Sequence, residues 1–569
     1  MTQPPPPPPN QPPQQGGFGP PQPPQPPPQQ PGYGYPHAPQ PPQAPPQQSG
    51  YGYPGRQPNP YAQQPTAYGQ PGYGYPGQPT MPMQPQPGQP GGGGRKTNTS
   101  LVIVVSALVA IALIIGGGVW YAKSGRGDGK QDTAGSSGGG KGGTGGTSSG
   151  GKEKVPADTA SDVLFKVPLP KANDTVVTSG SWITDKVYAK SGVARITGYD
   201  PGDGSELWTV ALPGPVCAAA NHVTSDGLTA VTFQPKMPKK GSSEGCSQVA
   251  AIDLNAGKRL WTKSVDSGDR AIGLDNVTVA QSTVAVGSTS GGAAFDITSG
   301  KVLWQPKPSD SCYDAGYGGG EKLVAVRKCS DRDSRQLHIQ TIDPTSGKVI
   351  SEYKMSEGIE YASVVSTDPL VVAADVGDSA GDGSGVSDYF SIDNRTGKLR
   401  TRIAAPSDSY GGHCDGITRV EFCQGIVVGN DRLYVPTEEK EGSDKFSRTN
   451  EIVAFDLATG KQTGQRADAG DGYTIHPVRM DGGNLIAYKR PPYDKGGQVV
   501  SIAGGSFKET KLLENPATGP GHEAETRMGP DSAEILFSRG RLYMSAVYAH
   551  KPDSTNGDEY LVVAFGTGN

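Results

Sequence analysis

Six copies of one eleven-residue pattern constrain the fold of this chain more than any other feature of its sequence. Each copy has an aspartate at its third position and a glycine at its seventh, and three copies end in tryptophan. The copies are GYDPGDGSELW (Gly198–Trp208), AIDLNAGKRLW (Ala251–Trp261), AFDITSGKVLW (Ala294–Trp304), TIDPTSGKVIS (Thr341–Ser351), SIDNRTGKLRT (Ser391–Thr401) and AFDLATGKQTG (Ala454–Gly464). Their aspartates, separated by 53, 43, 47, 50 and 63 residues, are Asp200, Asp253, Asp296, Asp343, Asp393 and Asp456.

Each copy predicts two short strands joined by a tight turn. The aspartate carboxylate can accept hydrogen bonds from the turn amides, and the glycine four residues later supplies a positive φ. Another alternating apolar run precedes most copies, as at Val284–Ser288 and Arg432–Pro436. Units of this length with several strands each indicate the blades of an all-β propeller. We therefore interpret the six aspartates as structural turn residues.

Two degenerate copies raise the expected number of blades to eight. Val499–Thr510 lacks the aspartate, and Leu561–Asn569 lacks the outer strand of its unit. We expect the segment 163–169, at the start of the domain, to supply that missing strand and pair with the last blade, because such pairing leaves no open sheet edge. The predicted domain is an eight-bladed propeller over residues 158–569, with seven blades as the alternative.

The repeated units resemble those of the pyrroloquinoline-quinone-type propeller family. The resemblance covers roughly residues 160–569 and rests on the six quoted copies. That family includes quinoprotein alcohol dehydrogenases, the non-catalytic propeller BamB of the outer-membrane assembly machinery and sensor ectodomains of some bacterial kinases. The resemblance implies the fold strongly and leaves the function open, since one fold hosts many functions.

The first 157 residues divide into three segments of different composition. Residues 1–100 are rich in Pro, Gln, Gly and Tyr and predict a disordered tail, which also resembles the tails of actinobacterial membrane proteins. Residues 101–122 contain no charged side chain and are long enough to cross a bilayer of roughly 30 Å as one helix. Residues 123–157 are mostly Gly, Ser and Lys and predict a flexible linker.

All six cysteines follow the predicted membrane span. They are Cys217, Cys246, Cys312, Cys329, Cys414 and Cys423. An even number on one side of a membrane favours disulfides in an oxidising compartment. Fifteen pairings are possible, and pairing in sequence order keeps each bridge within or beside one blade. A zinc site is the alternative, although CxxC-like spacing is absent. Disulfides would place the propeller outside the cytoplasm and the N-terminal tail inside it.

No residue pattern in the chain specifies a reaction. By resemblance, a quinoprotein dehydrogenase would need adjacent cysteines, a tryptophan floor and a metal held by carboxylates, and no two cysteines here are adjacent. The tryptophans that end the repeats are expected to pack between blades. An acidic loop at residues 375–388 is the one candidate calcium ligand set, but its spacing departs from that of an EF-hand. We expect no catalytic, metal-binding or cofactor-binding residues.

Charge narrows the range of partners. Up to Lys154 there are nine basic and three acidic residues, whereas the rest of the chain carries 42 basic and 52 acidic ones. An acidic folded domain lacks the electrostatic footprint that nucleic acid requires. We therefore expect a non-catalytic, membrane-anchored, extracytoplasmic scaffold that binds an envelope protein or a small-molecule ligand. The alternatives are a transmembrane sensor, whose Pro-rich tail contacts a cytoplasmic protein, and a quinone-dependent dehydrogenase.

Overall fold

The computed structural model describes residues 153–239, 245–307, 309–331, 334–377, 385–414, 419–443, 447–530, 532–551 and 558–567. The predicted tail (1–100), the predicted membrane helix (101–122) and most of the predicted linker lie outside these residues. Among the described residues, no helix has both the length and the apolar character that a membrane span needs.

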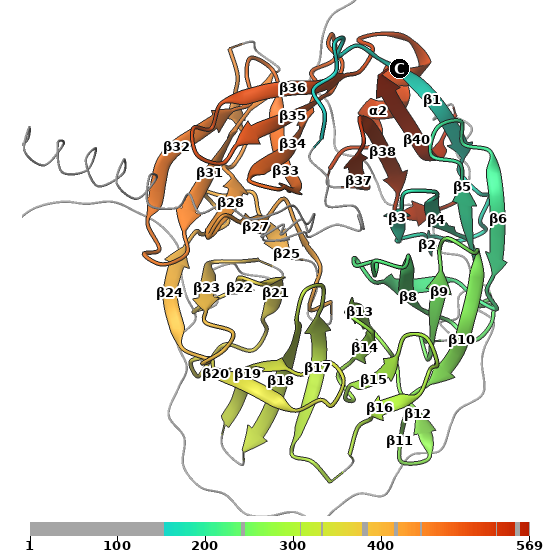
Figure 1. Ribbon diagram of the computed structural model, residues 1–569, viewed down its shortest axis with the longest axis vertical. Coiled ribbons are helices and arrows are strands. Elements are labelled where there is room, and N and C mark those ends of the chain that lie inside the picture. The colour runs from blue at the N-terminus through green and yellow to red at the C-terminus, as the bar shows by residue number, and fades with distance from the viewer. Residues whose placement is uncertain are drawn as a thin grey trace, which may run out of the picture. The chain divides into compact units, whose positions relative to one another are not determined.

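Eight four-stranded antiparallel sheets are arranged around a central axis as the blades of a propeller (Figure 1). We number the blades 1 to 8 in chain order and give their strands from the axis outward. Blade 1 consists of β3 (Ser181–Ile183), β4 (Tyr188–Gly192), β5 (Arg195–Tyr199) and β6 (Glu206–Ala211). Blade 2 consists of β7 (Val216–Ala219), β8 (Leu228–Phe233), β9 (Gln248–Asp253) and β10 (Lys258–Ser264). Blade 3 consists of β13 (Asn276–Ala280), β14 (Thr283–Gly287), β15 (Ala293–Asp296) and β16 (Val302–Trp304). Blade 4 consists of β17 (Cys312–Gly318), β18 (Leu323–Asp331), β19 (Ser334–Ile342) and β20 (Val349–Lys354).

The remaining blades continue the ring. Blade 5 consists of β21 (Ser363–Thr367), β22 (Leu370–Ala374), β23 (Asp388–Ile392) and β24 (Leu399–Ala404). Blade 6 consists of β27 (Val427–Gly429), β28 (Arg432–Pro436), β31 (Glu451–Asp456) and β32 (Gln462–Asp468). Blade 7 consists of β33 (Thr474–Asp481), β34 (Asn484–Arg490), β35 (Gln498–Ala503) and β36 (Glu509–Glu514). Blade 8 consists of β37 (Ala533–Ser538), β38 (Arg541–Ala546), β40 (Tyr560–Thr567) and β1 (Ser161–Pro168). The eight sheets confirm the prediction of eight blades over the alternative of seven.

The ring is closed by the first strand of the domain. β1 pairs antiparallel with β40, from Ser161 opposite Thr567 to Pro168 opposite Tyr560. This is the strand that the sequence suggested at residues 163–169. Because β1 completes blade 8, two segments about 400 residues apart in the chain form one sheet, and the ring has no open edge at its junction.

The repeat aspartates close the turns between the third and fourth strands. Asp296 shows the pattern: its Oδ1 accepts hydrogen bonds from the backbone N and the Oγ of Ser299, at 2.7 and 2.6 Å. The other five repeat aspartates also accept backbone N–H groups two or three residues ahead. The glycines of the six turns have φ between 64° and 71°, and they are Gly204, Gly257, Gly300, Gly347, Gly397 and Gly460.

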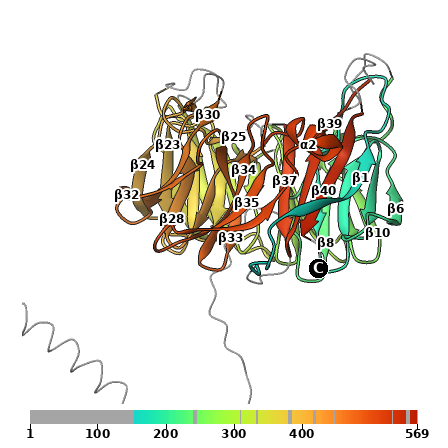
Figure 2. The ribbon, with the colours of Figure 1, turned by 90° about the horizontal axis from the view of Figure 1, so that it is seen from above.

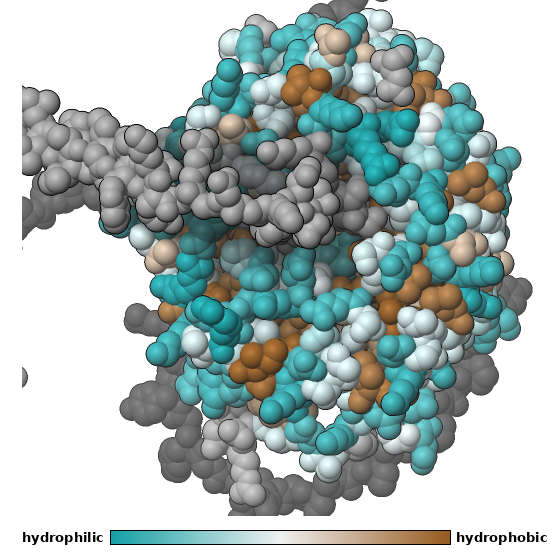
Figure 3. All heavy atoms as spheres, viewed as in Figure 1, coloured by the Kyte–Doolittle hydropathy of each residue, from teal (hydrophilic) through white to brown (hydrophobic). Residues whose placement is uncertain are grey.

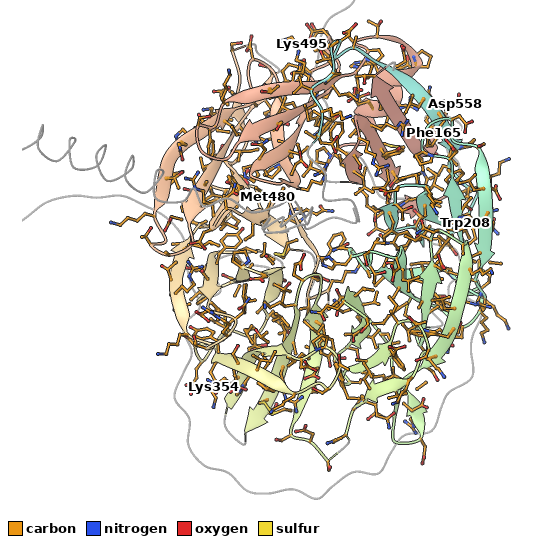
Figure 4. The ribbon with its side chains drawn as sticks, in the orientation of Figure 1. Phe165, Trp208, Lys354, Met480, Lys495 and Asp558 are labelled. Carbon is orange, nitrogen blue, oxygen red and sulfur yellow. A yellow bond between two sulfur atoms is a disulfide. The ribbon has the colours of Figure 1, made fainter. Side chains whose placement is uncertain are left out.

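The repeat tryptophans pack on the turn glycines of the next blade. A Cβ added to Gly257 would lie 2.3 Å from Cγ of Trp208, and Trp261 and Trp304 cover the next two turn glycines in the same way. At the ring junction Phe165 of β1 takes this place over Gly204. Phe165 and Trp208 both lie along the outer part of the ring in Figure 4. The expectation that these tryptophans pack between blades is thereby confirmed.

The hydrophobic core lies between the faces of neighbouring blades. Ile196 of blade 1, for example, packs in one cluster with Val231 and Phe233 of blade 2. Similar clusters join the other neighbouring blades, and the blade 7–8 cluster includes Ala524 and Met528 of the region around α2 (Gly519–Thr526). The core is therefore a ring of interfaces, which leaves the innermost strands free to line the axis.

The two faces of the ring differ in their connections. The turn face carries the links between first and second strands and between third and fourth strands. The loop face carries all other connections, including α2 and four short pairings: β2 (Val176–Val177) with β39 (Tyr548–Ala549), β11 (Asp266–Ser267) with β12 (Arg270–Ala271), β25 (His413–Cys414) with β26 (Cys423–Gln424), and β29 (Lys440–Glu441) with β30 (Arg448–Thr449). Figure 2 shows α2, β30 and β39 on the same side of the ring.

Glu153 fixes the start of the described chain to the turn face. Its carboxylate accepts a hydrogen bond from the Arg479 guanidinium at 2.5 Å and from the backbone N of Arg539 and Gly540 at 3.0 and 3.1 Å. The side chains of Glu153 and Arg479 are only 4% and 7% exposed. The last residues of the predicted linker are therefore bound between blades 7 and 8.

Candidate functional site: the axial plug

The connection between blades 5 and 6 enters the channel along the axis. We call its residues Arg419–Ile426 the axial plug; residues 415–418, just before it, lie outside the described part of the chain. The backbone O of Val420 accepts a hydrogen bond from the backbone N of Val364 on β21, at 2.7 Å. A Cβ added to Gly316 on β17 would lie 2.5 Å from the Val420 side chain. The plug therefore packs against innermost strands of blades 4 and 5.

Glu421 is the residue of the plug with the most polar contacts. Its Oε1 accepts hydrogen bonds from His222 Nε2 and from the backbone N of Gly319, both at 2.7 Å. Its Oε2 accepts the hydroxyl of Thr278 at 2.5 Å, and its backbone O accepts Nδ2 of Asn221 at 3.0 Å. These groups belong to blades 2, 3 and 4. Because His222 and Gly319 follow the innermost strands on the turn face, the plug reaches that end of the channel.

The pair formed by His222 and Glu421 is largely shielded from solvent. The two side chains are 13% and 9% exposed. Burial disfavours the charged imidazole, but the carboxylates of Glu421 and Glu321 favour it, and the pKa of His222 is raised above its ordinary value. The plug is therefore held by a hydrogen bond that gains charge on protonation of the imidazole.

A second charged pair lies at the axis between blades 1 and 8. Lys190, which is fully buried on β4, donates to Oε2 of Glu534 on β37 and to the backbone O of Thr178, each at 2.7 Å. The other carboxylate oxygen of Glu534 accepts the backbone N of Gly180 at 2.7 Å. Burial lowers the pKa of Lys190, although Glu534 opposes this shift. Each charge has a partner, as buried ions require.

Small cavities remain beside the plug. One of about 30 Å³ is lined by Asn221, Arg419, Glu421 and Glu534 together with strand residues of blades 2 and 3. Another of about 180 Å³ lies between the plug and blades 7 and 8, with Phe422, His476 and Glu534 among its lining residues. Both are smaller than the roughly 300–1,000 Å³ of a typical small-molecule site. A larger cavity of about 410 Å³ lies on blade 8 beside α2 and shares no lining residue with these two.

The six predicted cysteines form three disulfides, paired in sequence order. We call Cys217–Cys246, Cys312–Cys329 and Cys414–Cys423 the first, second and third disulfides. All three lie on the side of the loop face, and among the described residues no cysteine is free. The third disulfide joins β25 to β26, and its Cys423 belongs to the plug, two residues after Glu421. The zinc alternative for these cysteines is therefore wrong.

The sequence did not identify the axial residues. The six repeat aspartates lie at turns of the turn face, away from Glu421, as expected for structural residues. The one signal that could have located the plug is the longest spacing between repeats, 63 residues, together with the cysteine pair inside it. His222, Thr278, Lys190 and Glu534 carry no motif, because only the ring brings their blades together.

The residues of this propeller do not fit a quinone cofactor at the axis. The plug occupies the channel, and no two cysteines are adjacent. Trp182 is 1% exposed and donates its indole N–H to the backbone O of Ala220, so it packs between blades. Among the residues that the structure describes, no group of three His, Cys, Asp or Glu side chains is placed to hold a metal ion. In the acidic loop, Asp378 and Asp382 lie outside the described residues, and Asp388 pairs with Arg402.

The sequence profile of the family described as outer membrane protein assembly factor BamB matches the chain twice, over residues 175–311 and 245–500. The matches together span more than half of the 569 residues. The chain belongs to this family. A BamB-like propeller suggests a protein-interaction scaffold, in keeping with an axis filled by the chain itself. A search of curated proteins finds no match.

Solved structures that resemble this BamB-like chain include enzymes and non-enzymes. The crystal structure of BamB from Moraxella catarrhalis is 13% identical and covers 72% of this chain and 100% of that chain, with a TM-score of 0.37. The quinohemoprotein alcohol dehydrogenase from Comamonas testosteroni is 12% identical and covers 72% of this chain and 77% of that chain, with a TM-score of 0.40. At these values neither structure carries an argument about function.

Proposed function

We propose that this BamB-like propeller is a non-catalytic scaffold that binds a protein partner outside the cytoplasm and is anchored to the membrane by residues 101–122. The observation that carries the proposal is the plug: Arg419–Ile426 occupies the channel along the axis and leaves only small cavities beside it, and Glu421 is fully engaged with blades 2 to 4. A ring whose axis is occupied in this way offers its faces for binding instead.

The disulfides further support a protein partner at the loop face. The three disulfides hold connections on that face, which is expected of a surface whose loops must keep one shape. Figure 3 shows the opposite, turn face, which is mainly hydrophilic, with hydrophobic side chains in small separate groups. The turn face therefore lacks the apolar surface of a permanent subunit interface. The disulfides also support an oxidising compartment.

Site-specific photo-cross-linking in cells tests this proposal. A photoreactive amino acid replaces Tyr493, which is 88% exposed in a connection of the loop face, and the matched control replaces Lys348 in a turn of the turn face. We expect a discrete cross-linked protein from position 493 and none from position 348. Absence of an adduct at 493, or quinone-dependent dye reduction by the purified full chain, would contradict the proposal.

The same experiment separates the scaffold from the sensor alternative. In a chain lacking residues 1–94 the adduct at position 493 should persist, since the scaffold does not require the tail. A cytoplasmic protein that is cross-linked to the full chain and lost with residues 1–94 would instead favour a transmembrane sensor.

A further inference from the structure

The groups that hold Glu421 are positioned by the blades and not by the plug. Thr278 is fully buried on β13. The backbone O of Gly319 accepts the hydroxyl of Thr367 at 2.8 Å, and the backbone O of His222 accepts the hydroxyl of Thr229 at 3.0 Å. Each donor is therefore fixed by neighbours within its own part of the ring. Glu421 is between 102 and 199 residues away from the three donors in the chain.

We propose that blades 2 to 4 form a carboxylate-binding site on the propeller axis, which this chain fills with its own Glu421. The ligand class is a planar carboxylate, such as the side chain of an acidic peptide, and the plug is its internal occupant. The inference concerns the axis and goes beyond the proposed function, because it does not depend on a partner at the loop face.

The arrangement of donors selects a carboxylate. The Oε1 position receives two donors, the imidazole N–H of His222 and the backbone N–H of Gly319, so only an acceptor fits there. The Oε2 position receives the hydroxyl of Thr278. Two acceptor oxygens in one plane, facing three donors in a buried site, are what a carboxylate presents, and hydrogen bonds to a charged acceptor are stronger than neutral ones.

A cavity next to this position would add to the space that removal of the carboxyl group opens for a small ligand. The cavity of about 30 Å³ is lined by Glu421 itself, and Arg419 supplies a cation to its wall while Asp275 and Glu534 supply carboxyl groups. Removing the carboxyl group of Glu421 would join its volume to this cavity. Acetate, which carries the same carboxylate and one methyl group, is therefore the smallest probe of the vacated site.

The test is chemical rescue of the purified full chain. Glu421→Ala vacates the site, while Glu421→Gln keeps its shape and serves as the matched control. Thermal unfolding is followed as sodium acetate replaces sodium chloride at constant ionic strength. We expect acetate to stabilise Glu421→Ala saturably, and acetate at ten times its dissociation constant raises the folded-to-unfolded ratio about elevenfold. Glu421→Gln and the unaltered chain should not respond.

A third variant identifies the donors. In His222→Ala/Glu421→Ala the affinity for acetate should fall at least about tenfold, because one hydrogen bond to a charged acceptor is lost. An acetate response of Glu421→Ala no larger than that of Glu421→Gln would overturn the proposal. If Glu421→Ala does not accumulate in folded form, its production with acetate in place of chloride gives the same test: recovery supports the site, and failure with both salts, when Glu421→Gln is recovered, overturns it.

Discussion

Two glycines with the same backbone conformation allow the packing of Trp208 on the next blade to be measured. Gly257 has φ of 64° and lies beneath Trp208, whereas Gly268, in the turn between β11 and β12, has φ of 65° and nothing within 4 Å of an added Cβ. Alanine at either position meets the same backbone strain. Only Gly257→Ala also places a methyl group 2.3 Å from Cγ of Trp208. The difference between the two variants therefore isolates the contact between blades.

The expected magnitudes follow from these two effects. Alanine in the left-handed region costs roughly 1–2 kcal/mol, and this cost applies to both variants. The clash with Trp208 forces the indole or the turn to move, and overpacking of this kind costs about 1–3 kcal/mol more. We expect the free energy of unfolding to fall by about 2–5 kcal/mol for Gly257→Ala and by about 1–2 kcal/mol for Gly268→Ala.

Urea unfolding followed by tryptophan fluorescence and by circular dichroism measures both variants. A double variant completes the comparison: in a Trp208→Ala background the cost of Gly257→Ala should fall to that of Gly268→Ala, since the clash is gone. Equal destabilisation by the two single variants would refute the reasoning, and so would an undiminished cost in the Trp208→Ala background.

Three further predictions concern hydrogen bonding, pH and the disulfides. Trp261 donates its indole N–H to the backbone O of Ile297 at 2.7 Å, whereas the buried indole N–H of Trp208 has no partner among the described residues. Trp261→Phe should therefore lower the free energy of unfolding in urea by about 1 kcal/mol more than Trp208→Phe. The pKa of His222, which faces Glu421 and Glu321, is raised, so its protonated imidazole stabilises the folded state. This contribution to the free energy of unfolding is complete below the ordinary pKa of 6.5 and is lost as pH rises through the folded-state pKa. The melting temperature of the unaltered chain should therefore fall relative to that of Glu421→Gln as pH rises above the ordinary value of 6.5, and parallel curves would contradict this. Serine pairs in place of the first and third disulfides, which span 29 and 9 residues, should cost about 3.6 and about 2.6 kcal/mol by loop entropy, and the reverse order in urea unfolding would show that the plug matters more than loop length.

The blades could be predicted because their information is local. Each repeat aspartate and its glycine act within six residues, and the strand that closes the ring is recognised by the absence of an outer strand in the last unit. The degenerate seventh unit keeps the turn without the aspartate. The backbone N of Phe507 donates to the backbone O of Ala503 at 2.8 Å, and Phe507 adopts a φ of 58° where other units have glycine.

The axial site could not be predicted because it depends on contacts between distant blades. Nothing near Glu421 in the sequence marks it as the acceptor for His222, Thr278 and Gly319, since their meeting requires the curvature of the complete ring. Pairing of the cysteines in sequence order was one of fifteen possibilities, and its preference rested on short distances within blades. The long spacing between the fifth and sixth repeats indicated an insertion but not the direction that it takes.

The contacts of Glu153 with blades 7 and 8 have a mechanical consequence for the ring. A pulling force on the chain before residue 153 meets the Arg479 ion pair and the amides of Arg539 and Gly540 before it reaches β1, which begins at Ser161. The load is thus passed to blades 7 and 8 through a buried charge pair, upstream of the strand that closes the circle. Force applied to the chain before residue 153 therefore acts on the contacts of Glu153 before it acts on the pairing of β1 with β40 that closes the ring.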